Sequence, residues 1–511
     1  MPYKMRNLAS YIVFEMKRAL IAILCLLTVS GAFAQDVKDR TAYIYNIDRS
    51  LWYNSSSVAG LARDDIAQWR NIQASYDLEN GKFTDSWGSE SAMGLTLNGD
   101  MLMELGTLKV LAGLSLERNF LGKSRYNTGL YSVSWDMPYF TAINANTSFL
   151  WRQSHASVNV GVVSPLMIND MISAGIGFSM DLLGASKSAV PQCRYRGLDL
   201  AVTPSVTVAV NEENVVGLSV NFRTRPSRSI LTSDEPNTTA LFLQGLGEYS
   251  VRWVGGEIGM APLDYNTRVI GAALQYNHIG NSSEWLLEAS LDSWDSSVTE
   301  NDVRLGKVAK YVTGFTATGL FGDKLNRKLT LDLKYNLNYW IPSLSTRPVA
   351  NNSIIDGNIN YTVYTGAYES GFNWVLGLGM DMAMLRLKRI NPVSKLTSNN
   401  VLPYAFLGKD ISISKEHSLL ARLKLGYNFS AGNEFNYGGD SAEGNYIVNY
   451  MLDDEMDYLS SYYLSTTLNL DYTYRMNDRL SAYASLSSGL LSPMDRNTSR
   501  FILQLSVGTL F

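Results

Sequence analysis

Charged side chains stand at alternate positions in several segments of this chain, with apolar residues at the positions between them. Arg422 and Lys424 alternate with leucines, and Asp471 and Arg475 share one parity of a later segment. In a water-filled channel such charges steer ions and polar solutes and set selectivity. The alternative is that they only pair with one another inside a polar interior. The full set of candidates is Arg223, Asp332, Lys334, Arg422, Lys424, Asp471 and Arg475.

The histidines offer little for catalysis. His155 follows Ser154, and His417 precedes Ser418. Neighbours on a strand point to opposite faces, so neither pair can share a proton. Hydrolysis would need a histidine beside a serine or an aspartate in one site. We therefore expect no catalytic residue.

Cysteine content and charge exclude further classes. Only Cys193 lies beyond the first 34 residues, so the chain has no disulfide framework and no zinc spacing. The formal net charge is -4, and no basic run suggests binding to nucleic acid. We expect no metal, no cofactor and no nucleic-acid partner.

The elements that would position the charges are strands, because apolar and polar residues alternate with a period of two. From Leu329 to Tyr339, leucines and tyrosines alternate with polar residues. No segment beyond residue 34 has the run of about 20 apolar residues that a membrane-spanning helix needs. Lipid admits only helices and closed barrels. We predict an all-β fold over residues 67–511, a closed antiparallel transmembrane β-barrel of about 18 strands, within a range of about 14–18.

Connections of two lengths alternate along this predicted barrel. Outer-membrane barrels have short periplasmic turns and long outer loops, so the alternation favours that architecture. A soluble propeller, the alternative, would place polar residues outside and apolar residues inside. Short turns are expected at 106, 211–214, 279–282, 322–327, 412–414 and 477–478, and long links at 120–146, 227–265, 341–352 and 431–459.

Residues 1–34 predict a cleaved export signal. Lys17 and Arg18 precede an apolar run over residues 19–29, which is too short to span a bilayer as a helix. The run is followed by Ala32-Phe33-Ala34, a small-x-small cleavage pattern.

Residues 35–66 form an N-terminal segment ahead of the first predicted strand. Asn54 to Leu61 resembles the Asn-Pro-Ala-Gly-Leu hatch motif of fatty-acid-transporter-type barrels, with Ser56 in place of the proline. One interpretation is a small plug inside the lumen, with Asn54, Gly60 and Leu61 as its candidate residues. The other is an arm in the periplasm.

The chain ends on a strand-like segment. Residues 501–511 carry apolar side chains at odd positions and end on Phe511. This ending resembles the signal by which the barrel-assembly machinery of Gram-negative bacteria recognises and inserts outer-membrane barrels. It implies the outer membrane as the location, outer-membrane lipids as partners and Phe511 as the insertion signal.

A wider resemblance covers residues 50–511. Its marks are Trp52 to Leu61, Trp135 to Tyr139, Pro191 with Arg196, and Thr203 to Ser205 opening a strand pair. With these the chain resembles a family of outer-membrane β-barrels of unknown function from Bacteroides-type bacteria. The resemblance implies a nutrient-uptake setting, with a TonB-dependent receptor or a surface lipoprotein as a partner, and supplies no biochemical activity.

Two classes of function stay open. The first is passage or capture of a small solute at the outer membrane, as an accessory to a TonB-linked nutrient or iron uptake system. The second is a non-transporting barrel that anchors surface or secretion proteins through its long loops. The segment before the first strand is too short for the folded plug of a TonB-dependent receptor, so we do not expect the chain to be such a receptor itself.

Overall fold

A computed structural model describes residues 39–511, except 125–139, 143–148, 188–189, 191, 237–238, 244–248, 254, 256–260, 323, 346, 367–370, 439–452 and 478. The expected export signal, Trp135 to Tyr139 and Pro191 lie outside the described residues.

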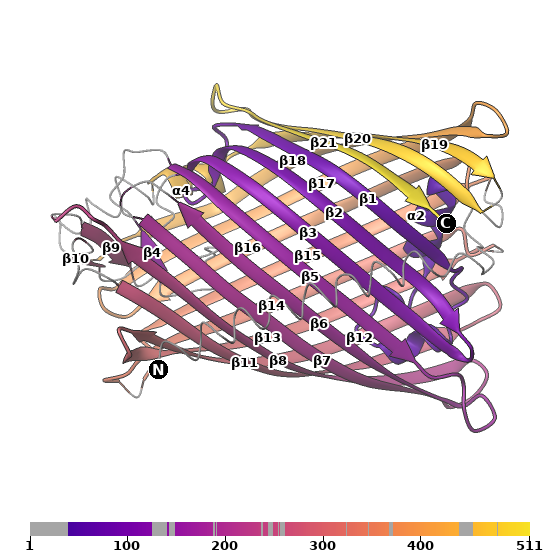
Figure 1. The fold of residues 1–511 in the computed structure, drawn as a ribbon, viewed down its shortest axis with the longest axis horizontal. Coiled ribbons are helices and arrows are strands. Elements are labelled where there is room, and N and C mark those ends of the chain that lie inside the picture. The colour runs from indigo at the N-terminus through magenta and orange to yellow at the C-terminus, as the bar shows by residue number, and fades with distance from the viewer. Residues whose placement is uncertain are drawn as a thin grey trace.

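Eighteen strands form a closed barrel (Figure 1). Each strand pairs antiparallel with its neighbours, and β1 closes the circle by pairing with β21 from Asn71–Leu510 to Gly81–Arg500. The prediction of a closed antiparallel barrel of about 18 strands is confirmed. The strands are β1 (Trp69–Gly81), β2 (Ser89–Leu105), β3 (Leu108–Ser124), β5 (Phe149–Val163), β6 (Ile172–Lys187), β7 (Gln192–Ala209), β8 (Asn214–Thr232), β11 (Ala261–Ile279), β12 (Ser283–Glu300), β13 (Val303–Phe321), β14 (Arg327–Pro342), β15 (Ala350–Thr365), β16 (Trp374–Arg389), β17 (Ser394–Ser412), β18 (His417–Asn436), β19 (Tyr463–Asn477), β20 (Leu480–Pro493) and β21 (Arg500–Leu510).

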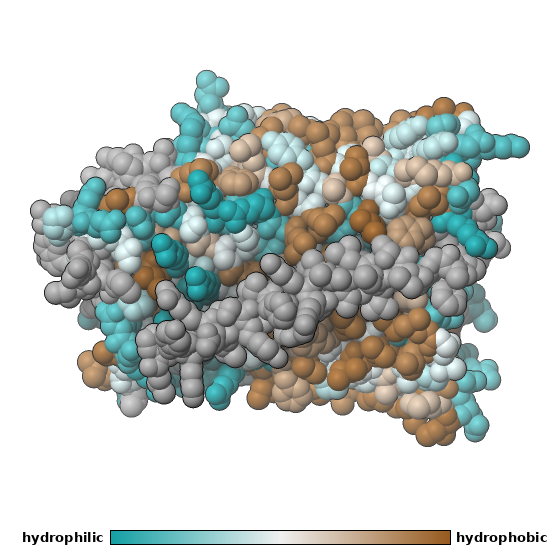
Figure 2. Space-filling view, in the orientation of Figure 1, coloured by the Kyte–Doolittle hydropathy of each residue, from teal (hydrophilic) through white to brown (hydrophobic). Residues whose placement is uncertain are grey.

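The outer face of the barrel is apolar. On β11, Ile270 and Leu274 are 63% and 60% exposed, whereas Gln275 and Asn277, of the opposite parity, are buried. Apolar side chains form a band across the middle of the molecule (Figure 2). Soluble proteins rarely expose so much contiguous apolar surface, whereas a barrel in lipid requires it. The outward residues are therefore the lipid-facing surface of a transmembrane barrel.

The connections sort to the two ends of the barrel. The turn end carries connections of two to eight residues, such as 106–107 and 164–171, and the loop end carries the long connections 125–148, 233–260 and 437–462. The expected strict alternation of short and long connections is nevertheless wrong, because residues 301–302 join β12 to β13 at the loop end. Asn301 and Asp302 have φ values of 49° and 64°, as a two-residue hairpin turn requires.

One strand boundary also differs from expectation. Thr203 to Ser205 lie inside β7 and do not open a strand pair. The pairing of β7 with β6 continues through Pro204, while the pairing with β8 omits Thr203 and Pro204. Because proline has no N–H to donate, it is tolerated where the ladder to one neighbour is interrupted.

Five further elements, besides a short helix at residues 58–62, are not part of the barrel wall. At the loop end, β4 (Phe140–Ala142), β9 (Thr239–Leu243) and β10 (Tyr249–Trp253) form a small sheet, near helix α4 (Asp453–Leu459) (Figure 1). At the turn end, near the C-terminus, lies helix α2 (Arg40–Arg49). The Asp39 side chain accepts from the Ala42 amide and caps its first turn. Among the described residues, no helix is both long enough and apolar enough to cross a bilayer.

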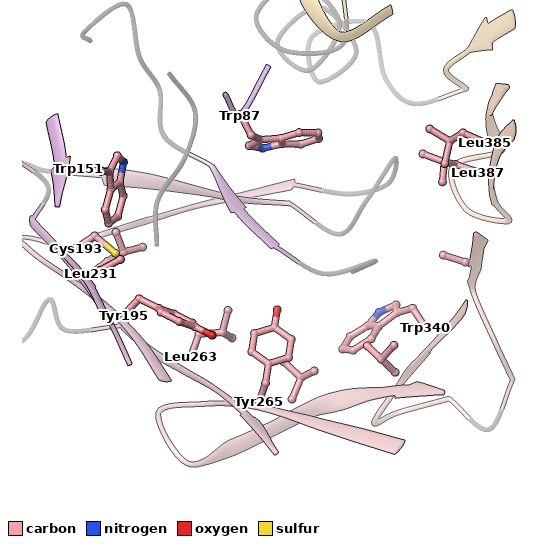
Figure 3. Packing of buried hydrophobic residues seen from close by; sticks show 14 of the residues in the cluster. Trp87, Trp151, Cys193, Tyr195, Leu231, Leu263, Tyr265, Trp340, Leu385 and Leu387 are labelled. Atoms are coloured by element: carbon pink, nitrogen blue, oxygen red, sulfur yellow. The ribbon is translucent and has the colours of Figure 1, made fainter. Parts of the chain in front are cut away.

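Inward side chains at the loop end form an apolar collar (Figure 3). They come from many strands, and Trp87 from the β1–β2 connection packs with them. Partly buried Met456 and Leu459 of α4 cover part of the collar. The collar comprises Trp87, Trp151, Ala185, Cys193, Tyr195, Leu231, Leu263, Tyr265, Val298, Val308, Trp340, Ala350, Leu385, Leu387 and Leu396.

Candidate functional site: the lumen and the N-terminal segment

Residues 39–66, called the N-terminal segment below, contact inward side chains around the turn end of the barrel. The short 3₁₀ helix η1 (Val58–Ala62) packs against β5, β6, β7 and β8. There the wall carries glycine: a Cβ on Gly175 would lie 2.7 Å from the Ala59 nitrogen. Serine hydroxyls of the wall form hydrogen bonds with both backbone groups of Ala59: Ala59 N donates to Ser205 Oγ at 2.9 Å, and Ser173 Oγ donates to Ala59 O at 2.9 Å. Small and hydroxylated wall residues thus let the segment approach closely.

The first turn of α2 binds the opposite side of the wall through charges. Arg475 donates to the carboxylate of Asp39. Arg40 Nε lies 3.7 Å from Asp471 Oδ1. Thr41 Oγ1 donates to Asp410 Oδ1 at 3.1 Å. The carboxylate of Asp471 is therefore shared between the N-terminal segment and the wall, because Arg422 Nη2 also donates to it at 3.2 Å.

The rest of α2 reaches two more sectors of the wall. Tyr43 Oη donates to Asp100 Oδ2 of β2 at 2.8 Å. At the other end of the helix, Lys328 Nζ lies 2.9 Å from Asp48 Oδ1, and Tyr364 donates its hydroxyl proton to the same carboxylate. The N-terminal segment is thus tied to strands on all sides of the barrel by polar contacts.

A buried carboxylate organises the segment itself. Asp64 accepts from the Ser50 hydroxyl and from the amides of Trp52 and Tyr53, each amide at 3.0 Å. Burial raises the pKa of Asp64 above its usual range, although these hydrogen bonds oppose the shift. Lys109 of β3 links this part of the segment to the wall, because its Nζ donates to the Asp64 backbone carbonyl at 3.0 Å.

The three residues predicted for a plug all make contacts, either within the N-terminal segment or with the wall. Asn54 Nδ2 donates to the Ile47 and Ser50 carbonyls at 2.9 and 2.7 Å. Gly60 packs so closely on Trp52 that a Cβ would lie 1.9 Å from the indole. Leu61 is buried in a cluster that includes wall residues Trp69, Leu102 and Val163.

The predicted lumen charges divide into groups. Arg422 pairs with Asp471, and Asp471 and Arg475 contact the N-terminal segment, as described above. Lys424 lies 3.8 Å from Asp381 Oδ2, and its ammonium stands 3.5 Å from the centre of the Tyr404 ring. The other three stand apart from this group.

On the far side of the lumen, Arg223 Nε lies 2.8 Å from Asp199 Oδ1. Asp332 and Lys334 of β14 are inward and exposed, and they lie opposite Asn358 and Asp356 in the register with β15.

A charged group around His155 on the lumen wall was not predicted from the sequence. His155 faces inward, with its Nε2 3.0 Å from Asp181 Oδ1 and its Nδ1 3.4 Å from Glu117 Oε2. The parity of β5 indicates that His155 faces inward, but its partners are on neighbouring strands and follow only from the register. Within the described part of the chain, no group of three or more His, Cys, Asp or Glu side chains is arranged to hold a metal ion.

A polar cavity of about 270 Å³ lies between the N-terminal segment and the wall. Arg40 and Tyr43 contribute from α2, and the wall side comes from β1, β2, β3 and β5. Its lining is rich in amides and hydroxyls, which suit a hydroxylated or zwitterionic solute better than an apolar one. The wall residues are Asn71, Gln73, Asn98, Gly99, Asp100, Gly113, Leu114, Ser115, Ser157 and Asn159.

Fold and site together define a transmembrane β-barrel with an N-terminal segment bound inside its turn end. The chain belongs to the family of unknown function DUF6850, which matches residues 58–511. The comparison with curated proteins gave no match.

Three solved structures with a similar fold are distant from this chain in sequence. FrpB, an iron transporter from Neisseria meningitidis, is 7% identical, with a TM-score of 0.45 and coverage of 87% of this chain and 81% of that chain. The siderophore receptor PiuA from Acinetobacter baumannii is 9% identical, with a TM-score of 0.44 and coverage of 87% and 82%. CdiB from Acinetobacter baumannii is 10% identical, with a TM-score of 0.37; the match covers 88% of this chain but only 61% of CdiB. These similarities concern the fold alone.

Proposed function

We propose that this protein spans the outer membrane of a Gram-negative bacterium and passes or captures a small polar solute, and that the N-terminal segment is a plug that closes its periplasmic mouth. Short turns face the periplasm in barrels of this kind, so the turn end is the periplasmic end. The observation that carries the proposal is the ring of polar contacts between the segment and the wall, from Asp39–Arg475 to Asp48–Lys328.

Such contacts suit a plug that moves. Each hydrogen bond or partly exposed ion pair contributes only about 1 kcal/mol net, because water replaces it when it breaks. The polar contacts can therefore be exchanged for water stepwise, while full release also exposes Tyr45, Trp52 and Leu61, which are buried against apolar wall residues. The lumen charges Arg223, Asp332, Lys334, Arg422 and Lys424 would then act on the solute as selectivity residues, while Asp471 and Arg475 hold the plug.

The setting is part of the proposal. A link to TonB-dependent nutrient or iron uptake rests on the family resemblance, as does contact with a surface lipoprotein. Insertion by the barrel-assembly machinery rests on the ending at Phe511, whose amide donates to the Arg70 carbonyl of β1 at 2.9 Å. No catalytic step is proposed.

A reversible crosslink tests the plug. The side chains of Thr41 and Asp410 touch, at 3.1 Å between Oγ1 and Oδ1, so Thr41→Cys with Asp410→Cys should form a disulfide that fixes the segment to β17. The native Cys193 is fully buried and should not interfere. We expect planar-bilayer conductance, or uptake of small sugars into liposomes, to be low when oxidised and to rise on reduction.

The matched control is a disulfide within the wall. Ser418 and Thr473 are directly opposite each other on β18 and β19, so Ser418→Cys with Thr473→Cys should leave conductance independent of the redox state. If the segment crosslink changed conductance no more than this wall crosslink, the plug proposal would be wrong.

The anchoring function is favoured by one observation. Strands β4, β9 and β10, from two separate long connections, form a sheet beyond the barrel rim, and such a sheet is a platform on which another protein can dock. Replacing residues 239–253 by a short Gly-Ser turn should abolish co-purification of a surface lipoprotein if this function holds. Absence of conductance in both redox states of the Thr41–Asp410 crosslink would then support the anchor over the pore.

A further inference from the structure

Five arginines near the loop end are on the outward face of β3, β5, β7 and β8. The antiparallel registers place the outward positions of β3, β5, β6, β7 and β8 in continuous rows. The arginines are Arg118, Arg152, Arg194, Arg196 and Arg228, and all five are exposed.

Three of these arginines surround a floor of small residues. One row runs Arg152, Ser186, Arg194, and the next runs Ser154, Gly184, Arg196. A Cβ on Gly184 would meet nothing within 4 Å, so the floor is open to a ligand. Because adjacent strands are about 4.8 Å apart, the Cα atoms of Arg152 and Arg194 stand about 10 Å apart across it. Arg152, Arg194 and Arg196 with this floor are called the arginine cradle below.

The cradle carries uncompensated charge. Arg228 makes a two-pronged ion pair with Asp264 at 2.5 and 2.7 Å, and Arg118 donates to the Ser154 hydroxyl. Arg152, Arg194 and Arg196 make no ion pair with any described residue. Arg196 and Arg228 are moreover directly opposite each other in the register, where like charges destabilise a sheet. Since Asp264 already offsets the charge of Arg228, the charge left without a partner at this pair of positions is that of Arg196.

The position of the cradle identifies the kind of anion. Counted from Arg118, Gly184 and Arg196, the next outward residues toward the turn end are Leu116, Leu182 and Leu198. Farther in the same direction lie exposed Phe178 and Val202. Hydrophilic side chains also gather toward the loop end of this side of the barrel, beyond the apolar band (Figure 2). The cradle thus lies where acyl chains end and headgroups begin. The guanidinium fork matches the oxygens of a phosphate group.

We propose that the arginine cradle binds a phosphate group of lipopolysaccharide in the outer leaflet. The proposal rests on the outer-membrane location but not on the plug or on transport. A zwitterionic phospholipid fits less well, because the outward carboxylate beside the cradle, Asp264, is already paired with Arg228.

The test uses the full mature protein in a neutral detergent and bisphosphorylated lipid A as the probe. Binding is measured by native mass spectrometry, with dephosphorylated lipid A and inorganic phosphate in parallel. We expect Arg194→Gln with Arg196→Gln to weaken lipid A binding at least tenfold, and Gly184→Leu, which fills the floor without removing charge, to weaken it severalfold. Dephosphorylated lipid A should bind the wild type as weakly as lipid A binds the double variant, and inorganic phosphate should compete only at far higher concentration.

The matched control removes two outward cations elsewhere at the loop end. Arg386 and Lys388 on β16 are exposed and face outward, and Arg386→Gln with Lys388→Gln should leave lipid A binding within twofold of wild type. Each variant is first shown to fold by its heat-modifiable migration in SDS gels. The proposal is overturned if dephosphorylated lipid A binds equally well, or if the control pair loses as much affinity as the cradle pair.

Discussion

The two ends of the lumen are filled in different ways. At the turn end, the N-terminal segment meets the wall through a ring of polar contacts, as in Asp39–Arg475 and Thr41–Asp410, and through small apolar clusters around Trp52 and Leu61. At the loop end, inward Trp151, Trp340 and Leu387 form an apolar collar that is almost fully buried. Water can replace polar contacts at little net cost, whereas exposing apolar surface costs about 25 cal/mol per Å². The collar should therefore maintain the shape of the barrel while the turn end changes.

The largest effect should come from the collar. Trp340 is 1% exposed, and Trp340→Ala should lower the free energy of unfolding by about 3–5 kcal/mol, because it leaves a cavity among packed side chains. Urea unfolding in detergent micelles, followed by tryptophan fluorescence and gel migration, measures the loss. Leu344→Ala is the control, since Leu344 is fully exposed and its removal should change nothing measurable. A destabilisation no larger than that of Leu344→Ala would contradict the structural role of the collar.

The next effect should appear at the seam between η1 and the wall. Gly175→Leu places a side chain where Ala59 now lies, so it should destabilise the bound segment by about 1–3 kcal/mol and raise conductance severalfold or more. Gly184→Leu is the matched control on the same strand, β6, because Gly184 faces outward and a Cβ there meets nothing within 4 Å. Equal conductance of the two variants would mean that the segment does not close the lumen.

Much of this barrel could be predicted from sequence because alternation is local. The period-two pattern over residues 329–339 coincides with β14, and the strand total follows from summing such patterns. The turn at Asn301-Asp302 was not among the expected turns, although Thr299 to Asp302 form a polar interval and Asn and Asp readily adopt positive φ. Pro204 was expected to help open a strand pair, but it lies within β7. Only the pairing of β7 with β8 omits it, and the sequence does not show which neighbouring strand omits a pair.

The candidate site was harder to predict because its contacts join distant parts of the chain. Asp39 and Arg475 are separated by 436 positions, and no local pattern links them. Parity indicated that Arg422 and Asp471 face the lumen, but not that Arg40 would bind the same carboxylate. The role of His155 could not be predicted because its partners, Glu117 and Asp181, are on the two neighbouring strands, whereas its neighbour in sequence, Ser154, faces outward.

A smaller effect than that of Gly175→Leu is expected from the ion pair at the far end of α2. Lys328→Met should weaken the bound state of the segment by about 1 kcal/mol, because Asp48 is partly exposed and water compensates it. Conductance of the variant should rise about fivefold, and the difference from wild type should shrink in 1 M salt. In a double-mutant cycle with Asp48→Asn, strict additivity would show that the two side chains do not interact.

The smallest effect should be a pH dependence of closure that arises at Asp64. In the bound segment, burial raises the pKa of Asp64, whereas a released and solvated segment would have the ordinary value near 3.9. Between these two values the bound state holds more protons. Its extra stability is therefore present at low pH and is lost as pH rises through the raised pKa.

Acidification from pH 7 toward pH 4 should accordingly lower conductance, on the order of a few-fold for one partly titrating group. Asp64→Asn mimics the protonated, uncharged carboxyl group and keeps its size, so its conductance should lose this pH dependence while the barrel still folds. If conductance rose on acidification, or if Asp64→Asn kept the full response, then a group on the wall would control closure. In that case a polar contact other than those of Asp64 would control closure at the turn end, while the loop end stays fixed.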